Sequence, residues 1–309
     1  MTKIKTPVLF LIFNRPDTTR RVFQKIREAK PSRLYIACDG PRAHNKHDIK
    51  KIKQVKKITT NIDWPCKVKT LFRDKNLGCK KAVSQSITWF FNKEKQGIIL
   101  EDDCVPSKSF FLYCEKFLNV FYKNKKIWSI SGYNHFQNGN KNFFFFSRTP
   151  GVWGWATWKD RWKKYKTNPK IVKIKNFHSY GFIFTSFWNN IFKNINCKSN
   201  SWDYQFVYLI MKNQGYSIRP NLSLIKNIGF GNDATHTKEK FQSANANEYD
   251  IASSNLIGLN KSSLLDRQLF FKRFFSTNKK IFFGYIKYSL IFIFEKLNFF
   301  KLYKQIKDK

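Results

Sequence analysis

The chain is poor in acidic residues. It holds 20 aspartates and glutamates against 58 lysines and arginines, which gives a formal net charge of +38. Such an imbalance indicates an anionic partner, such as a nucleic acid, a phosphorylated substrate or an acidic membrane face. The excess is mostly lysine and accompanies many phenylalanine, isoleucine and asparagine residues, a composition that an A/T-rich coding sequence also produces. Charge alone therefore does not choose among these partners.

Three further features are absent, and each excludes a class of protein. None of the six cysteines forms a CxxC pair, which argues against zinc and disulfide frameworks and predicts reduced thiols in a cytosolic protein. No run reaches the roughly 18 uncharged apolar residues that a membrane-spanning helix needs. Residues 1–7 lead directly into a strand pattern, so we expect no signal peptide.

Apolar residues are abundant. Of 309 residues, 42% are hydrophobic and 18% are aromatic, which is enough for the core of one large α/β domain. In the first 125 residues, helical patterns alternate with apolar strands at 8–13, 34–38, 68–72 and 97–100. This alternation predicts a doubly wound, mostly parallel sheet. Each of the four strands ends in polar or charged residues, at the edge where open α/β sheets bind ligands.

The second half of the chain is less regular. We expect strands at 127–131, 143–147 and 216–220, and a helix from 202 to about 213. Between them lie a glycine- and tryptophan-rich turn at 150–158, which leads into a short helix, and a glycine-rich loop at 228–237. We interpret residues 1–260 as one domain, with a nucleotide-binding half at 1–125 and a smaller half at 126–260.

Residues 261–309 differ in composition. Phenylalanine, isoleucine and leucine recur there at near-helical spacing, with lysine and arginine between them. Basic amphipathic helices of this kind bind anionic membrane surfaces. The alternative is an ordinary C-terminal helix that packs on the domain.

Three consecutive acids follow the fourth strand: Glu101, Asp102 and Asp103. Carboxylates crowded at the end of a buried strand repel one another unless a positive group lies beside them. Mg²⁺ and Mn²⁺ bind such oxygen clusters, commonly through one or two carboxylates together with substrate phosphates. We therefore expect a metal–diphosphate site here. In the alternative reading, Glu101 and Asp102 are solvated and Asp103 caps the next helix.

Taken in order, these landmarks resemble the nucleotide-sugar glycosyltransferases of the GT-A fold, most closely the N-acetylglucosaminyltransferase I type and related bacterial sugar transferases. The resemblance covers about residues 7 to 240. It rests on the segments 10–15, 38–40, 101–103, 109–113, 150–155, 202–203, 217–220 and 229–236. It implies a GT-A-like sheet with a Rossmann-like nucleotide-binding half and a smaller acceptor half.

The resemblance assigns roles to the residues at the strand ends. Asp103 would coordinate Mn²⁺ or Mg²⁺ on the diphosphate of the sugar nucleotide. Asp102 would contact the ribose or the metal shell, and Glu101 would support both acids. Arg15 and Asp39 would hold the nucleotide, with Asp39 on its base. In the alternative readings, Arg15 is a solvated turn residue and Asp39 forms a turn with the glycine that follows it.

The resemblance also assigns roles in the second half. Trp153, Gly154 and Trp155 would form the wall of the pocket for the donor sugar and the acceptor, and His236 would lie near the metal or the diphosphate. The two tryptophans could instead be core aromatics, and His236 could be a surface histidine.

Asp203 would be the general base. The animal enzymes have two adjacent acids after the tryptophan, whereas here Asp203 is followed by Tyr204. Asp203 is the only acid at this place, so we assign the base to it. A carboxylate within hydrogen-bond reach can take the proton of an attacking hydroxyl. Direct displacement with one base inverts the anomeric carbon. In the alternative reading, Asp203 only caps the helix that it opens.

Together these features predict an inverting, metal-dependent glycosyltransferase that uses a nucleotide-sugar donor, by resemblance a UDP-sugar. Its acceptor would be a bacterial surface glycan or a lipid-linked saccharide at the cytoplasmic face of the cell membrane. One alternative is a basic nucleic-acid-binding protein, but the basic residues are spread along the chain and no nucleic-acid motif is present. Another is a nucleotidyltransferase on the same type of sheet, which usually carries a glycine-rich loop where this chain has residues 14–17.

Overall fold

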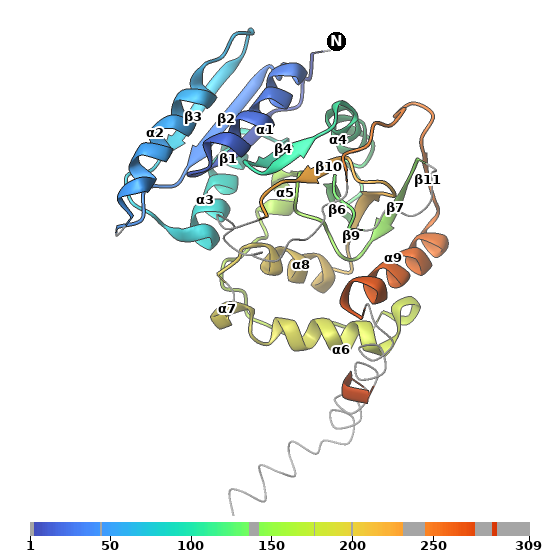
Figure 1. Ribbon diagram of the computed structural model, residues 1–309. Helices are drawn as coiled ribbons and strands as arrows, with labels where there is room; N and C mark the ends of the chain where they lie inside the picture. Colours follow the sequence, from blue (N-terminus) through green and yellow to red (C-terminus); the bar gives the residue numbers. More distant parts are fainter. Residues whose placement is uncertain are drawn as a thin grey trace, which may run out of the picture.

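The computed structural model describes residues 3–43, 45–135, 142–175, 177–198, 200–230, 245–275 and 286–288. Within these residues, nine strands form one mixed sheet in the order β11-β7-β9-β6-β8-β4-β1-β2-β3 (Figure 1). The strands are β1 Val8–Ile12, β2 Arg33–Cys38, β3 Lys67–Phe72, β4 Gln96–Glu101, β6 Ile127–Ser131, β7 Phe143–Ser147, β8 Trp155–Trp158, β9 Tyr216–Pro220 and β11 Asn255–Leu256. The predicted α/β class with a large, mostly parallel sheet is confirmed.

The first four strands are parallel, with β1 paired to both β2 and β4 and with β3 outside β2. They alternate with the helices α1 Pro16–Ala29, α2 Lys46–Thr60 and α3 Gly78–Lys93. Every residue of β1 is buried, because continuous apolar strands of a parallel sheet are covered on both faces. The parallel arrangement brings the carboxyl ends of these strands to one edge of the sheet.

Side chains of β1 alternate between two hydrophobic clusters, one on each face of the sheet. Phe10 packs with α1, α2 and α4 Lys108–Val120 on one face. Leu9 and Leu11 pack on the other face with α3 and with α8 Asp203–Lys212. A helix-covered sheet of this kind leaves its strand ends as the place where polar side chains gather.

Strand β8 corrects the prediction for residues 150–158. It lies antiparallel between β4 and β6, where we expected a turn leading into a helix. Its four residues are fully buried, and aromatic and β-branched residues such as Trp155 and Thr157 favour strands. The expected turn is therefore shorter and ends before Trp155.

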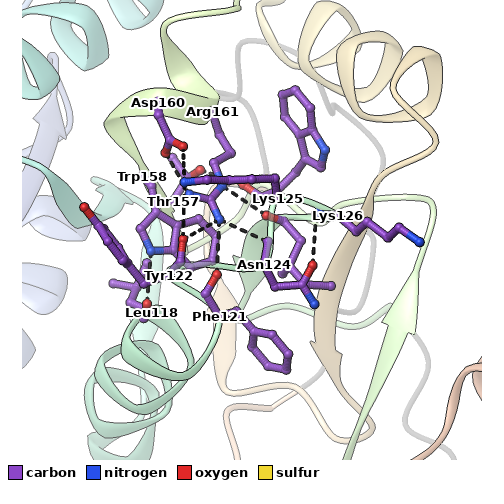
Figure 2. A network of polar contacts seen from close by, with 12 residues as sticks. Leu118, Phe121, Tyr122, Asn124, Lys125, Lys126, Thr157, Trp158, Asp160 and Arg161 are labelled. Atoms are coloured by element: carbon purple, nitrogen blue, oxygen red, sulfur yellow. Dashed lines mark hydrogen bonds and ion pairs between the residues drawn. The ribbon is translucent and has the colours of Figure 1, made fainter.

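The short helix α5 Lys159–Trp162 fixes β8 to the end of α4. Arg161 is almost completely buried, and its guanidinium donates to main-chain carbonyl groups beyond the last turn of α4 (Figure 2). Its Nη2 donates to the oxygens of Phe121, Tyr122 and Asn124 at 3.0–3.1 Å. Charged donors at a helix C-terminus satisfy carbonyl groups that the helix leaves unpaired. This network holds the second half of the sheet against the first.

A second, two-stranded sheet lies beside the acids. Its strands β5 Cys104–Pro106 and β10 Ile225–Asn227 are antiparallel. Immediately beyond this pair, the Ile228 N–H donates to the Asp103 carbonyl oxygen at 2.8 Å. The pairing brings the start of the predicted glycine-rich loop next to the acidic triplet.

The remaining helices pack at one side of the second half, and they are η1 His178–Tyr180, α6 Gly181–Phe192, α7 Ile195–Lys198 and α9 Leu259–Phe274 (Figure 1). In α9, Leu265 and Leu269 are buried against Phe145 of β7, so this part of the C-terminal region packs on the domain. Within the described residues no helix is long and apolar enough to cross a membrane. Binding of the C-terminal region to a membrane surface stays a prediction, as does the division of the chain at residues 125 and 260.

Candidate functional site

A cavity of about 340 Å³ lies at the carboxyl ends of β1, β2 and β4. Its wall combines charges of both signs, contributed by Arg15, Asp39, Arg42, Arg73, Glu101, Asp102 and Asp103. Aromatic surface is present as well, from Phe13, Trp153 and Phe230. Seven charged side chains around one cavity are costly to maintain unless they pair with one another or with a ligand.

The acidic triplet lies on the floor of this cavity. Glu101 is the last residue of β4, and Asp102 accepts a hydrogen bond from the Phe13 main-chain N–H at 3.0 Å. Burial raises the pKa of Glu101, and the charges of Asp103 and Asp102 raise it further. Burial, followed by the charge of Asp103, raises the pKa of Asp102 to about 7. The triplet therefore attracts positive charge.

Arg15 supplies part of that positive charge. Its Nη1 lies 3.0 Å from Oδ2 of Asp103, and both side chains are mostly buried, with exposed fractions of 16% and 17%. Arg15 precedes α1, whose first residue is Pro16. Because proline favours the first helical position, the turn after β1 is short and directs Arg15 over the sheet edge. The structure thus brings two of the predicted site residues into direct contact.

Asp39 has a structural role in addition to its place in the cavity wall. Its carboxylate accepts hydrogen bonds from the main-chain N–H groups of Leu77 and Gly78 at 3.0–3.1 Å, at the start of α3. Burial raises its pKa, and these N–H groups oppose the rise. A carboxylate at a helix N-terminus is favourable. Contact of Asp39 with a nucleotide base stays a prediction.

Two arginines of the cavity were not predicted. Arg42 follows β2, and its Nε and Nη2 bind the carboxylate of Asp48 at 2.7 and 2.8 Å. Asp48 is fully buried and also accepts from Nδ2 of Asn14. Arg73 follows β3 and donates to the Ser86 hydroxyl at 3.1 Å. An arginine within four residues of the end of each of the first three strands was a signal that could have identified both.

Gly229 lies against the acidic triplet. A Cβ atom at this position would be 2.0 Å from Oδ2 of Asp103, so only glycine lets the main chain pass this close. The Gly229 N–H donates to Oδ1 of Asn227 at 2.8 Å, which fixes the approach. The first residues of the predicted glycine-rich loop therefore cover Asp103. His236, at the other end of that loop, lies outside the described residues.

Of the three residues predicted to form the pocket wall at 153–155, the structure places only one at the cavity. Trp153 lines the cavity, and its ring contacts Tyr133 and Phe230 at centroid distances of 4.5 and 5.9 Å. Gly154 has a φ of +63° and packs against Ile225, outside the cavity lining. Trp155 is fully buried and stacks on a core tryptophan. Only Trp153 of the three faces the cavity.

Asp203 opens α8 and accepts a hydrogen bond from the Ser201 hydroxyl. It is not among the residues that line the cavity, but its charge contributes to the raised pKa of Glu101, after burial and the two neighbouring aspartates. An acid in the first turn also stabilises a helix. The structure places Asp203 near the acidic triplet, and its role as general base stays a prediction.

The acids suit a cation that a ligand helps to hold. Within the part of the chain that the structure describes, no three His, Cys, Asp or Glu side chains are grouped to hold a metal ion. Asp103 and Glu101 nevertheless offer hard oxygen donors, and no described residue donates a hydrogen bond to the Glu101 carboxylate. Magnesium sites often use one or two carboxylates and complete their coordination with phosphates and water.

Comparisons with known proteins add little. No family model matches the chain, and no curated protein matches it. One similar solved structure is the crystal structure of UDP-glucose pyrophosphorylase complexed with UDP-glucose, at 9% identity and a TM-score of 0.34, covering 87% of this chain and 99% of that one. A similarity this low carries no argument, so the fold rests on the strand order and register described above.

Proposed function

We propose that this protein is a glycosyltransferase that moves a sugar from a nucleotide diphosphate donor to a hydroxyl group. The observation that supports this most strongly is the Arg15–Asp103 pair at the floor of the cavity. The pair lies where parallel strands end and where α/β sheets commonly bind nucleotides. Arginine and carboxylate together suit a diphosphate and its counter-cation.

The donor would lie along the edge of β1, β2 and β4. Arg73 would face its anionic groups, since a guanidinium pairs well with phosphate oxygens. Arg42, whose Nε and Nη2 are bound to Asp48, would add positive charge through the rest of its guanidinium. Asp103 and Glu101 would hold a Mn²⁺ or Mg²⁺ ion, which when bound supplies positive charge beside the departing diphosphate. Trp153 and Phe230 would cover the sugar. By resemblance to the GT-A enzymes the donor is a UDP-sugar.

Transfer would proceed by direct displacement. The acceptor hydroxyl oxygen attacks the anomeric carbon while the bond from that carbon to the diphosphate oxygen breaks, so the configuration inverts. The proton of the hydroxyl passes to Asp203, and the nucleoside diphosphate leaves. Ser201, which donates to Asp203, would hold the carboxylate in place. We place this reaction at the cytoplasmic face of a bacterial membrane, with a surface glycan or lipid-linked saccharide as acceptor.

A nucleotidyltransferase suits the same charged cavity, because a nucleoside triphosphate and a sugar phosphate need similar counter-charges. The two reactions differ in what they release. A glycosyltransferase frees the nucleoside diphosphate from the sugar nucleotide, whereas a nucleotidyltransferase frees pyrophosphate from the triphosphate.

The test is to supply the protein with Mn²⁺ and a panel of UDP- and GDP-sugars, then with UTP or GTP and sugar 1-phosphates, and to identify products by mass spectrometry. We expect release of a nucleoside diphosphate from one sugar nucleotide, abolished by EDTA. Release of pyrophosphate only from the second set would replace the glycosyltransferase by the nucleotidyltransferase. Binding of generic DNA more tightly than any nucleotide sugar would contradict both.

A further inference from the structure

A second recess is linked to the cavity by a ring contact between its His135 and Trp153 of the cavity wall. It has a volume of about 10 Å³, which is room for about one water-sized group. Its polar wall comes from Asn134, His135, Thr149, Arg219 and Arg273. Two arginines and no carboxylate line it among the described residues, so the recess has a net positive charge.

Arg219 comes from β9 and is only 5% exposed. Its Nη1 donates to the carbonyl oxygen of Thr149, and its Nη2 to that of Tyr133, both at a long 3.3 Å. The Nε atom is buried and has no hydrogen-bond partner among the described residues. A buried donor without an acceptor is costly, and this one belongs to a side chain that lines the recess.

Arg273 comes from the last turn of α9. Its side chain remains accessible to solvent but stands among many protein atoms, and this desolvation, followed by the charge of Arg219, lowers its pKa to about 10. It is still cationic at neutral pH. Within the described residues no carboxylate pairs with it in an ion pair. The charge of buried Asp266 opposes the lowering of the pKa of Arg219, and the charge of Asp203 opposes that of Arg273, but within the described residues neither carboxylate forms an ion pair with its arginine. The repulsion between the two like charges is therefore only partly offset.

His135 adds a neutral polar group to these two cations. Burial, then the charges of Arg273 and Arg219, lower its pKa to about 2. Its ring contacts Trp153 at a centroid distance of 5.5 Å. Trp153 therefore lines the cavity and also contacts the histidine of the recess, which links the two places through one side chain.

The proposed base interacts electrostatically with groups in both places. The charge of Asp203 raises the pKa of Glu101 on the cavity floor, and it also favours the charged form of Arg273, in each case as a smaller contribution than burial. Asp203 is thus within electrostatic range of both the acids and the recess.

We propose that the recess of Arg219 and Arg273 binds an oxyanion carried by the acceptor, so that the acceptor of this enzyme is an acidic molecule. The oxyanion is a carboxylate or a phosphate, and one of its oxygens fits the recess between the two guanidinium groups. The assignment of the oxyanion to an acceptor rests on the proposed function, whereas the anion site itself does not.

The test is isothermal titration of three probes, namely inorganic phosphate, the methyl glycoside of glucuronic acid and the neutral methyl glucoside. Each is titrated into the wild type and into Arg273→Gln in the presence of UDP and Mn²⁺, which occupy the donor cavity. Arg267→Gln is the matched control, because it removes one positive charge from the same helix outside the recess. Arg273→Lys keeps the charge but not the planar guanidinium.

We expect phosphate or the glucuronide, but not the glucoside, to bind the wild type and Arg267→Gln equally. Binding should weaken about tenfold or more in Arg273→Gln, as the loss of a charge-assisted hydrogen bond requires, and less in Arg273→Lys. Preference for the glucuronide indicates a carboxylated acceptor and preference for phosphate a phosphorylated one. Affinities that are the same in all variants would overturn the proposal.

UDP binding in the same proteins separates the two proposals. It should be unchanged in Arg273→Gln. If no protein binds UDP while oxyanion binding without UDP still depends on Arg273, the anion site stands and the glycosyltransferase falls. If UDP binds and oxyanion binding ignores Arg273, the glycosyltransferase stands and the recess is not an acceptor site.

Discussion

Nη1 of Arg15 lies 3.0 Å from Oδ2 of Asp103 and joins the ends of β1 and β4 by an ion pair. The residues are 88 positions apart in the chain. Removing one partner of a mostly buried pair leaves the other charge uncompensated. The pair brings opposite charges together at the cavity floor, and a ligand that brings phosphate for Arg15 and a cation for Asp103 satisfies both charges.

Gly229→Ala should weaken donor binding without unfolding the protein. Its Cβ would lie 2.0 Å from Oδ2 of Asp103, so the carboxylate or the loop must move. We expect the Kd for UDP with Mn²⁺ to rise about tenfold or more, since 1 Å shifts at a site are costly, with a melting temperature within a few degrees of wild type.

Gly258→Ala is the control, because nothing lies within 4 Å of a Cβ there. It should bind UDP as the wild type does. Equal UDP affinities for Gly229→Ala and Gly258→Ala, measured by calorimetry, would show that the contact between the loop and Asp103 has no bearing on the ligand.

Asp48→Asn should destabilise the protein in a pH-dependent way. The hydrogen bond from the Arg42 guanidinium is the main cause that lowers the pKa of Asp48 to about 2. Because the pKa is lower in the folded than in the unfolded chain, the stabilisation is complete above about pH 4 and is lost as the pH falls towards 2. Breaking the bonds of a charged group costs about 1–3 kcal/mol.

Urea unfolding at pH 7, 4 and 2.5 measures this effect. The difference in unfolding free energy between wild type and Asp48→Asn should be largest at pH 7 and shrink at pH 2.5. Asp17→Asn, at a residue with a 96% exposed side chain, should show little difference at any pH. A difference for Asp48→Asn that stays constant with pH would exclude the assigned ion pair.

Asp203→Asn should lower the rate of transfer and leave donor binding intact. An amide cannot take the hydroxyl proton, and general base catalysis commonly contributes 10²–10⁴-fold. We expect kcat to fall about a hundredfold or more, with the Kd for UDP within about twofold of wild type. If kcat is retained, Asp203 only stabilises the start of α8 and the base must be sought among the acids of the cavity.

The first four strands and their convergent ends could be predicted, because continuous apolar runs that alternate with amphipathic helices have few other solutions. The acidic triplet followed from the same reasoning, and so did the placement of Arg15. Strand β8 could not be predicted, because Gly154 and the two tryptophans around it are as typical of a turn as of a strand. Only the pairing of β8 with β4 and β6 makes Trp155 a core residue.

Arg42 was missed for a different reason. Its position depends on Asp48, which a sequence pattern reads as an ordinary residue of the first turn of α2 and which the fold buries beneath Asn14. The approach of Gly229 to Asp103 likewise depends on the pairing of β5 with β10. The arginine after each of the first three strands was a local signal for Arg42, but the contacts of Asp48 with Asn14 and of Gly229 with Asp103 join segments far apart in the chain, and local patterns do not predict them.

The most direct test of the account is calorimetric titration of UDP into the wild type, Asp103→Asn and the exposed control Asp17→Asn, each with and without Mn²⁺. The account predicts binding that requires Mn²⁺ in the wild type and in Asp17→Asn, and a loss of at least about tenfold in Asp103→Asn. Binding of equal strength in all three proteins, or binding that ignores Mn²⁺, would contradict it.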